Sequence, residues 1–98
     1  MAIKSCEIIG FPELDPVENF EFVSNTSYGT FKFHFKWINE AWSCWVTLPD
    51  ESVRQAGVYP NVKNWTGFND YGLVFVTSLE KIDFSSLFLT ELYLIKWQ

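Results

Sequence analysis

One segment in the middle of the chain constrains its fold more than any other. Residues 31–37 read Phe-Lys-Phe-His-Phe-Lys-Trp, so an aromatic residue stands at every second position. Successive side chains of a β-strand point to opposite faces of the sheet. As a strand, this segment places its four aromatic side chains on one face and Lys32, His34 and Lys36 on the other. The alternation therefore predicts a strand with one face in the core and one face in water.

The segments around this strand predict more strands of similar length. Residues 38–41 are expected to turn the chain into a strand over residues 42–48, and this hairpin is the expected nucleus of the fold. Turn residues interrupt the apolar segments about every ten positions, which is typical of sandwiches and barrels. The fold class is predicted as all-β, a single small antiparallel β-sandwich or a partly open barrel. The other predicted elements are strands at residues 53–59, 72–79 and 91–97, a turn at 49–52, a long loop over 60–71 and a single helical turn over 83–88.

The N-terminal part of the chain differs from the rest. Residues 1–19 contain Gly10, Pro12 and Pro16 and show neither helical nor alternating periodicity, and the two prolines forbid a continuous helix. We expect an extended N-terminal arm that lies along the domain or reaches a neighbouring subunit. Short apolar alternation begins at residue 20, and a chain of 98 residues holds one domain. The single β domain is therefore placed at residues 20–98.

The aromatic content of the chain fits a core, but its placement raises a question. The sequence has 10 Phe, 5 Trp and 4 Tyr residues, a load that one core of this size can absorb. Residues 73–76 and 91–97, however, carry apolar side chains on both faces of their predicted strands. A sheet with one face in water should alternate apolar and polar residues instead. Trp45 likewise lies on the face opposite Trp42. Either the domain itself covers these faces or another chain does.

We expect part of this aromatic excess to lie in contacts between subunits. Obligate interfaces resemble a core cut in half, and aromatic side chains are their usual anchors. The N-terminal arm is expected to dock on a neighbouring subunit. The candidate interface residues are Trp45, Trp65, Tyr71, Tyr93 and Trp97.

The charge balance argues against two classes of partner. The sequence has 12 acidic and 7 basic residues, which gives a net charge of −5 at neutral pH. Nucleic acids and anionic membrane surfaces attract proteins of the opposite sign. No apolar run approaches the roughly 18 residues of a spanning helix, and the N-terminus lacks the pattern of a secretory signal. We expect neither nucleic acid nor a membrane as a partner.

The side chains needed for catalysis are scarce in this sequence. His34 is its one histidine and stands between Lys32 and Lys36, whose like charge opposes protonation of the imidazole. A serine or cysteine nucleophile would need His34 as its base, and the sequence has no Gly-x-Ser-x-Gly turn. We therefore predict a protein that is not an enzyme and has no catalytic residues. A small enzyme would depend on His34.

Metal and cofactor sites also lack their usual sequence patterns. The zinc-type ligands are Cys6, Cys44 and His34, with no Cys-x-x-Cys pair among them. No Gly-rich loop precedes a helix, so the sequence does not predict a phosphate-binding loop for a nucleotide. We expect no metal and no bound cofactor. A lone pair of cysteines in a chain without an export signal predicts two buried thiols rather than a disulfide.

The order of motifs along residues 20–97 resembles that of a known family. The motifs are Phe-Glu-Phe-Val at 20–23, Gly29, Phe-Lys-Trp-Ile-Asn at 35–39, Ala-Trp at 41–42 and its strand to 48, Pro-Asp at 49–50, Gly-Val at 57–58 and Gly-Leu-Val-Phe at 72–75. This order is similar to that of the small plug proteins of contractile-tail phage baseplates. In that family a short β domain carries an aromatic-Asn turn, a Trp-bearing strand, an Asp turn, a Gly-containing strand and a strand that opens with Gly-Leu.

The resemblance implies a structural role. It implies a non-enzymatic virion component that is made in the host cytoplasm and packs as a plug near the hub at the end of the tail tube. The implied partners are other baseplate, hub or tail-tube proteins, segments of the tape-measure protein and copies of the chain itself. A second interpretation stays open, a small carbohydrate-binding β-sandwich in which exposed Trp45, Trp65 or Tyr71 stacks on sugars.

Overall fold

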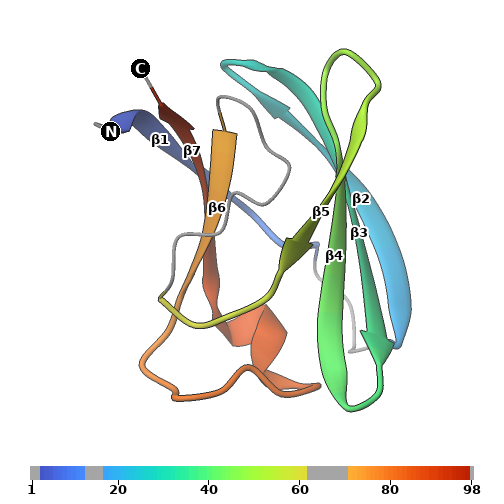
Figure 1. Cartoon of the computed structure of the whole chain (residues 1–98). Helices are drawn as coiled ribbons and strands as arrows, with labels where there is room; N and C mark the ends of the chain where they lie inside the picture. The colour runs from blue at the N-terminus through green and yellow to red at the C-terminus, as the bar shows by residue number, and fades with distance from the viewer. Residues whose placement is uncertain (1–2, 13–16, 62–70, 98) are drawn as a thin grey trace.

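Two antiparallel β-sheets packed face to face form the protein (Figure 1). The computed structural model describes residues 3–12, 17–61 and 71–97. In these residues the smaller sheet has the strand order β1-β7-β6, and the larger sheet has the order β2-β3-β4-β5. The predicted all-β class is confirmed, and of its two forms the open sandwich is observed. The elements are β1 (Ile3–Ile9), β2 (Asn19–Thr26), β3 (Gly29–Ile38), β4 (Ala41–Thr47), β5 (Val53–Gly57), β6 (Tyr71–Val76), the 3-10 helix η1 (Ser86–Leu89) and β7 (Glu91–Trp97).

The alternating aromatic strand is β3, and it forms the expected hairpin with β4. Phe33 pairs with Val46, and Phe35 pairs with Cys44. Asn39 and Glu40 connect the two strands with φ angles of 52° and 61°. Left-handed backbone at both central positions is what the commonest two-residue hairpin turn requires. Asparagine adopts this conformation more readily than most residues, so the turn forms here without glycine.

A second hairpin joins β2 to β3. Its strands pair without a break from Asn19 opposite Lys36 to Thr26 opposite Gly29. Gly29 has a φ of 121°, and a Cβ atom there would lie 2.8 Å from Cγ of Pro49. A glycine satisfies both the backbone angle and the close approach of the proline ring. This hairpin and the β3–β4 hairpin together form three of the four strands of the larger sheet.

The core lies between the sheets and is built on the alternate aromatic residues of β3. Phe31, Phe33 and Phe35 have no exposed surface. The ring of Phe35 stacks on Phe20 of β2 at 5.2 Å between centroids and meets Phe75 of the smaller sheet edge-on at 6.1 Å. Both arrangements are favourable for aromatic pairs. The predicted burial of this face is therefore confirmed for the three phenylalanines, whereas Trp37 is partly buried against the core. The smaller sheet adds the buried aliphatic residues Leu73, Leu92 and Leu94.

One end of the sandwich is held by a tryptophan and an aspartate. Nε1 of Trp42 donates a hydrogen bond to the backbone oxygen of Asp83 at 2.9 Å. The carboxylate of Asp83 accepts from the backbone N–H of Ser86, also at 2.9 Å, at the start of η1. The helical turn predicted over residues 83–88 is thus present, but it begins later, at Ser86, and ends at Leu89.

The opposite end is held by polar contacts between the two sheets. Glu7 of β1 accepts hydrogen bonds from the backbone N–H and the hydroxyl of Ser27 in the β2–β3 turn, the latter at 2.7 Å. The hydroxyls of Ser5 and Tyr28 share another hydrogen bond. Nζ of Lys96 in β7 lies 5.7 Å from the centre of the Tyr28 ring. We call these five residues the polar clasp.

The N-terminal segment is part of a sheet rather than an appended arm. Strand β1 (Ile3–Ile9) pairs with β7 along the smaller sheet, and Ile9 is buried in the core. The segment is extended and lies along the domain as expected, but placing the start of the domain at residue 20 is wrong. A register shift between Ile3 and Ser5 interrupts the strand, and Ile8 and Ile9 stand side by side in the sequence. Both features hide the alternation that identifies a strand.

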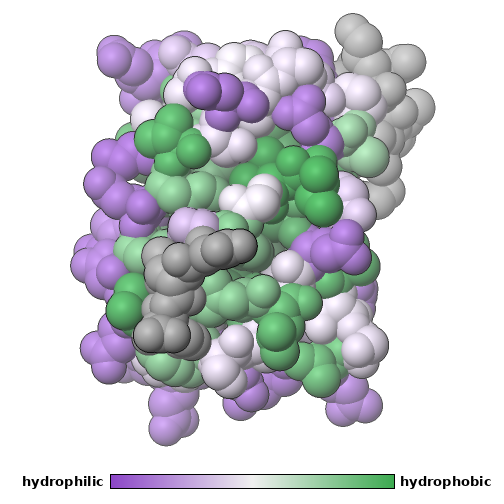
Figure 2. Space-filling model, turned by 180° about the vertical axis from the view of Figure 1, so that it is seen from behind, coloured by the Kyte–Doolittle hydropathy of each residue, from purple (hydrophilic) through white to green (hydrophobic). Residues whose placement is uncertain are grey.

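The residues after β1 close one side of the sandwich. The ring of Phe11 lies between the sheets, 5.9 Å from Phe22, 5.6 Å from Phe35 and 5.8 Å from Phe88. Figure 2 looks onto the side where β1 and β2 are the edge strands. Hydrophobic side chains gather across the middle of this side, and hydrophilic ones lie around them.

Two strands are shorter than predicted. Strand β5 ends at Gly57 rather than at residue 59, and β6 ends at Val76 rather than at residue 79. Most of the loop predicted over residues 60–71 lies outside the described residues. At the start of that loop, Pro60 forms a parallel bridge with Phe75 at the edge of β6.

The packing of Phe35 leads to a stability prediction. Replacing Phe35 by alanine should lower the free energy of unfolding by about 3–5 kcal/mol, because the cavity would lie between two closely packed sheets. Urea unfolding followed by tryptophan fluorescence measures this loss. The matched control is Val23→Ala on the outer face of β2, where the side chain is exposed and the change should stay within about 0.5 kcal/mol. Equal losses for the two variants would contradict the described core.

Candidate interaction surface

Apolar side chains occupy the outer face of the smaller sheet, the face that points away from the core. The strand register places Ile8, Tyr93 and Val74 in one row across the three strands. Val76 and Ile95 lie on the same face in the rows on either side of it. Ile8 is 57% exposed and Val76 38% exposed, whereas Ile95 is buried. The expected two-sided apolar character of these strands is thus present, and part of the outer face is open to solvent.

A tyrosine and a glutamate form a polar contact on this face. The hydroxyl of Tyr93 donates a hydrogen bond to Oε2 of Glu91 at 3.0 Å. That hydrogen bond, together with the negative charge of the carboxylate, raises the pKa of Tyr93 above its ordinary value. Ionising the hydroxyl would remove the donor and place two negative charges side by side. Tyr93 therefore stays a neutral donor beside an apolar row.

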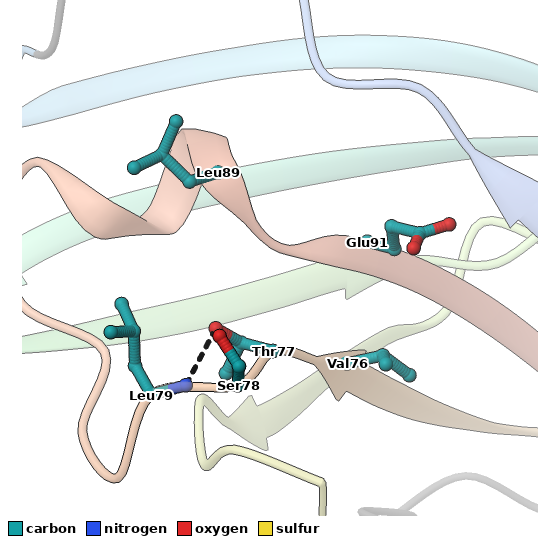
Figure 3. A pocket seen from close by; sticks show the side chains of 6 residues that line it. All are labelled: Val76, Thr77, Ser78, Leu79, Leu89 and Glu91. Carbon is teal, nitrogen blue, oxygen red and sulfur yellow. Dashed lines mark hydrogen bonds between the residues drawn. The ribbon is translucent and has the colours of Figure 1, made fainter.

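A pocket of about 350 Å³ opens at the end of this face (Figure 3). Val76 and Glu91 lie at one end of the pocket, and Leu79 and Leu89 lie at the other. Thr77 orders the loop between them, because its hydroxyl accepts a hydrogen bond from the backbone N–H of Leu79 at 3.2 Å. The pocket has an aliphatic rim and one carboxylate, which suits an apolar side chain of a partner protein better than a highly charged ligand.

The exposed aliphatic residues continue from the sheet into the pocket. Val76 belongs both to the outer face and to the pocket lining. Leu89 at the end of η1 is 79% exposed, and Leu79 is also exposed. Single exposed aliphatic residues are ordinary on protein surfaces, but a continuous group marks an interaction site. We define the apolar surface as Ile8, Val74, Val76, Leu79, Leu89 and Tyr93.

The outer face of the larger sheet is polar by contrast. One row across its strands contains Glu21, His34, Trp45 and Gln55. Nε2 of His34 lies 2.6 Å from Oδ1 of Asn19, and the imidazole ring lies 6.1 Å from the Trp45 ring. The histidine therefore sits in the outward strand position that its sequence pattern predicts, with a hydrogen-bonding partner.

Two lysines add to the polar character of this face. Nζ of Lys36 lies 5.7 Å from the centre of the half-buried Trp45 ring, within the range of a cation–π contact. Nζ of Lys32 lies 3.4 Å from Oε2 of Glu21 in an exposed ion pair. Exposed pairs of this kind contribute little to stability.

The five interface residues predicted from the sequence do not form one surface. Trp45 and Tyr93 lie on opposite outer faces of the sandwich. Tyr71 packs against the core, 5.2 Å from the ring of Phe31, with Nζ of Lys96 4.9 Å from its ring centre. Trp97 is the last residue of β7, opposite Ile3; its side chain lies outside the description. Trp65 lies outside the described residues.

Sequence reasoning missed most of the apolar surface. The sequence pattern places Ile8 in an N-terminal arm, and Leu89 follows a predicted helical turn whose orientation the sequence does not reveal. Val76 belongs to a segment already known to be apolar on both faces. A usable signal existed there, since a strand that is apolar on both sides must present one side away from its own core.

The two cysteines have different surroundings. Cys44 is buried between the sheets, and this burial raises the pKa of its thiol. Cys6 is exposed on the outer face of the smaller sheet, opposite Ile95. The prediction of two buried thiols is therefore correct for Cys44 and wrong for Cys6. The error has the same origin as the missed strand, because Cys6 has an outward position in β1.

Metal-ligating side chains do not gather in the part of the chain that the structure describes. Within residues 3–12, 17–61 and 71–97, no three His, Cys, Asp or Glu residues lie close enough together to hold a metal ion. Among these same residues, no helix has the length and hydropathy needed to cross a bilayer.

Comparison with known proteins finds no relative of this chain. No protein-family model, no curated protein and no solved structure matches the chain.

The contact between Tyr93 and Glu91 predicts a measurable titration. Replacing Glu91 by glutamine should lower the pKa of Tyr93 toward its ordinary value, because the carboxylate raises it. In the native protein the contact stabilises the fold below the ordinary tyrosine pKa, and this contribution is lost as the pH rises through the raised value. NMR of ¹³C-labelled tyrosine, assigned with Tyr93→Phe, follows the titration. Glu80→Gln, which alters an exposed glutamate elsewhere, should leave it unchanged. An unchanged Tyr93 titration in Glu91→Gln would rule out the contact.

Proposed function

We propose that this chain is a non-enzymatic structural subunit of a phage tail baseplate, packed as a plug near the hub at the end of the tail tube. The observation that carries the structural role is the apolar surface. Its partly exposed aliphatic side chains lie outside a core that is already filled by aromatic and leucine side chains. A contiguous group of this kind on a small domain favours contact with another protein.

The position of the apolar surface supports a protein partner of complementary shape. Its sheet portion is broad, and the pocket beside Val76 and Leu89 can take one side chain from the partner. Glu91 at the pocket edge would meet a basic or hydrogen-bonding group, since a buried carboxylate needs a partner. Large apolar contacts with a few satisfied polar groups are typical of permanent assemblies.

The identity of the assembly rests on the motif order along residues 20–97. In the structure the aromatic-Asn turn is the β3–β4 turn at Asn39, and the Gly-Leu opening is Gly72-Leu73 in β6. These positions suit the strand roles that the family resemblance implies. The proposed partners are other baseplate, hub and tail-tube proteins, tape-measure segments and further copies of the chain. The proposed location is the virion, after synthesis in the host cytoplasm.

A carbohydrate-binding module is the second candidate. The observation that favours it is the row of Glu21, His34, Trp45 and Gln55, in which an indole is flanked by hydrogen-bonding side chains. Lys36 lies over the indole and would have to move for a sugar to stack there. Tyr71 packs against the core and offers little ring surface. This candidate is therefore weaker than the structural role.

Co-expression tests the proposed function. The tagged chain should co-purify with tail-tube or hub proteins encoded by neighbouring genes. Ile8→Asp should weaken this complex by about tenfold or more, because it places a charge within an apolar contact.

The matched control for this experiment is Val53→Asp, which adds the same charge at a similarly exposed valine on the outer face of the larger sheet. The control should leave the complex intact. Absence of any complex would refute the baseplate role, and so would equal effects of the two variants. A tryptophan fluorescence response to glycans that is lost in Trp45→Ala would favour the carbohydrate-binding alternative instead.

A further inference from the structure

The four edge strands of the two sheets are not equally protected. The smaller sheet ends in β1 and β6, and the larger sheet ends in β2 and β5. An edge strand carries unpaired backbone N–H and C=O groups and can pair with a strand of another chain. Natural proteins block such edges with bulges, prolines, charged residues, covering segments or very short strands.

Strand β6 is blocked by the segment that leads toward it. The backbone N–H of Asn61 donates to the oxygen of Phe75 at 2.7 Å. The side chain of Asn61 donates from Nδ2 to the oxygen of Thr77 at 2.7 Å and accepts from the N–H of Thr77 at 3.1 Å. Pro60 lies beside Phe75 and has no N–H to offer a further strand.

Strands β1 and β5 carry other blocking features. The register of β1 shifts between Ile3 and Ser5, which bends the strand and interrupts its pairing edge. Strand β5 has five residues and includes Arg54. A short edge with a charged side chain is a poor template for another strand.

Within the described residues, strand β2 has no bulge and no proline, and Glu21 is its one charged side chain. It spans eight residues and pairs with β3 in unbroken register over its whole length. It contains neither proline nor lysine nor arginine. Of the strands in the described residues, β3 alone pairs with it. Strand β2 is the edge of the larger sheet on the side of the molecule shown in Figure 2, where hydrophobic side chains gather across the middle.

We propose that two copies of this chain pair through β2, antiparallel, about a two-fold axis at Phe22. The pairing joins two four-stranded sheets into one continuous antiparallel sheet. It is an isologous contact, in which the same residues are used on both sides. This inference rests on the self-association that the proposed function includes. It identifies β2 as the edge strand through which the copies associate.

The side chains of β2 favour an axis at Phe22 over one at Glu21. In a continuous sheet, core-facing residues of one copy lie opposite core-facing residues of the other. In an antiparallel two-fold pair this happens only when the axis lies at a residue and not between two residues. An axis at Glu21 would place two carboxylates opposite each other, which is unfavourable. An axis at Phe22 places Glu21 opposite Val23 of the second copy instead. It also brings together the two Phe22 rings, each half-buried at the edge of its own core.

Val23 offers a direct test of the pairing. It is 60% exposed and lies opposite Lys32 in its own chain, so Val23→Glu should fold normally. In the proposed dimer the new carboxylate faces Glu21 of the second copy, and symmetry repeats this repulsion. Sedimentation equilibrium from micromolar to millimolar protein should show a monomer–dimer equilibrium for the native chain. The dissociation constant should rise about tenfold or more in Val23→Glu.

The matched control is Val53→Glu at the opposite edge of the same sheet, where the valine is exposed to a similar degree. It should leave the dissociation constant unchanged. The double variant Glu21→Lys with Val23→Glu places opposite charges across the two-fold axis and should restore the dimer. Circular dichroism confirms that each variant is folded.

Three results would overturn the proposed pairing. They are a native chain that stays monomeric at millimolar concentration, a dimer weakened equally by the control, and a dimer that the double variant does not restore. A monomeric chain that still co-purifies with tail-tube or hub proteins would reject the β2 pairing and leave the proposed function standing. A β2-paired dimer that binds none of those proteins would do the reverse.

Discussion

The packing of the β3 aromatic row against the smaller sheet is the interaction on which the rest of the structure depends. Phe31, Phe33 and Phe35 are completely buried, and Phe35 contacts rings from both sheets. Burying three phenylalanine side chains contributes several kcal/mol, on the order of 1.5–3 kcal/mol for each. Because the row is contributed by one strand, the larger sheet has a rigid centre on which β2 and β4 align. The outer faces of both sheets are then free to differ.

The two outer faces do differ in character. The outer face of the larger sheet carries the ion pair of Lys32 and Glu21 and a histidine with a hydrogen-bonding partner. The outer face of the smaller sheet carries the apolar row around Tyr93. A domain that needed only to stay folded and soluble would gain nothing from this asymmetry. It is understandable in a subunit that turns one face to water and another to a partner, as we propose here.

The part of the fold that could be predicted from sequence is the part with strong alternation. The β3–β4 hairpin was predictable because aromatic and charged residues alternate without exception over residues 31–37. Strand β1 was not predictable in this way, because its register shift and its adjacent Ile8 and Ile9 break the pattern. Its partner β7 lies at the far end of the sequence, and local patterns carry no information about such pairing.

The candidate surface was predictable only in outline. The apolar two-sidedness of β6 and β7 indicated that either the domain itself or another chain covers these faces, and strand register then identified which side chains lie on the outer face. Tryptophan and tyrosine were expected to mark the contact, yet Tyr71 fills the edge of the core and Trp45 lies on the polar face. The type of a side chain suggested which residues could anchor a contact. Whether such a side chain is exposed depends on which strands become its neighbours in the folded sheets.

The polar clasp and the pairing of β1 with β7 have a consequence for how the molecule is made. Strand β1 is synthesised before the larger sheet and β7 after it, so the smaller sheet cannot form until β7 is made, whereas the larger sheet, built from consecutive hairpins, can form earlier. Contacts between distant parts of a sequence form slowly because a long loop must close first. Until then, the aromatic face of β3 has no opposite sheet to cover it. Synthesis therefore includes a stage in which the aromatic face of β3 is exposed. Rapid formation of the smaller sheet, or a chaperone, would protect the nascent chain during that stage.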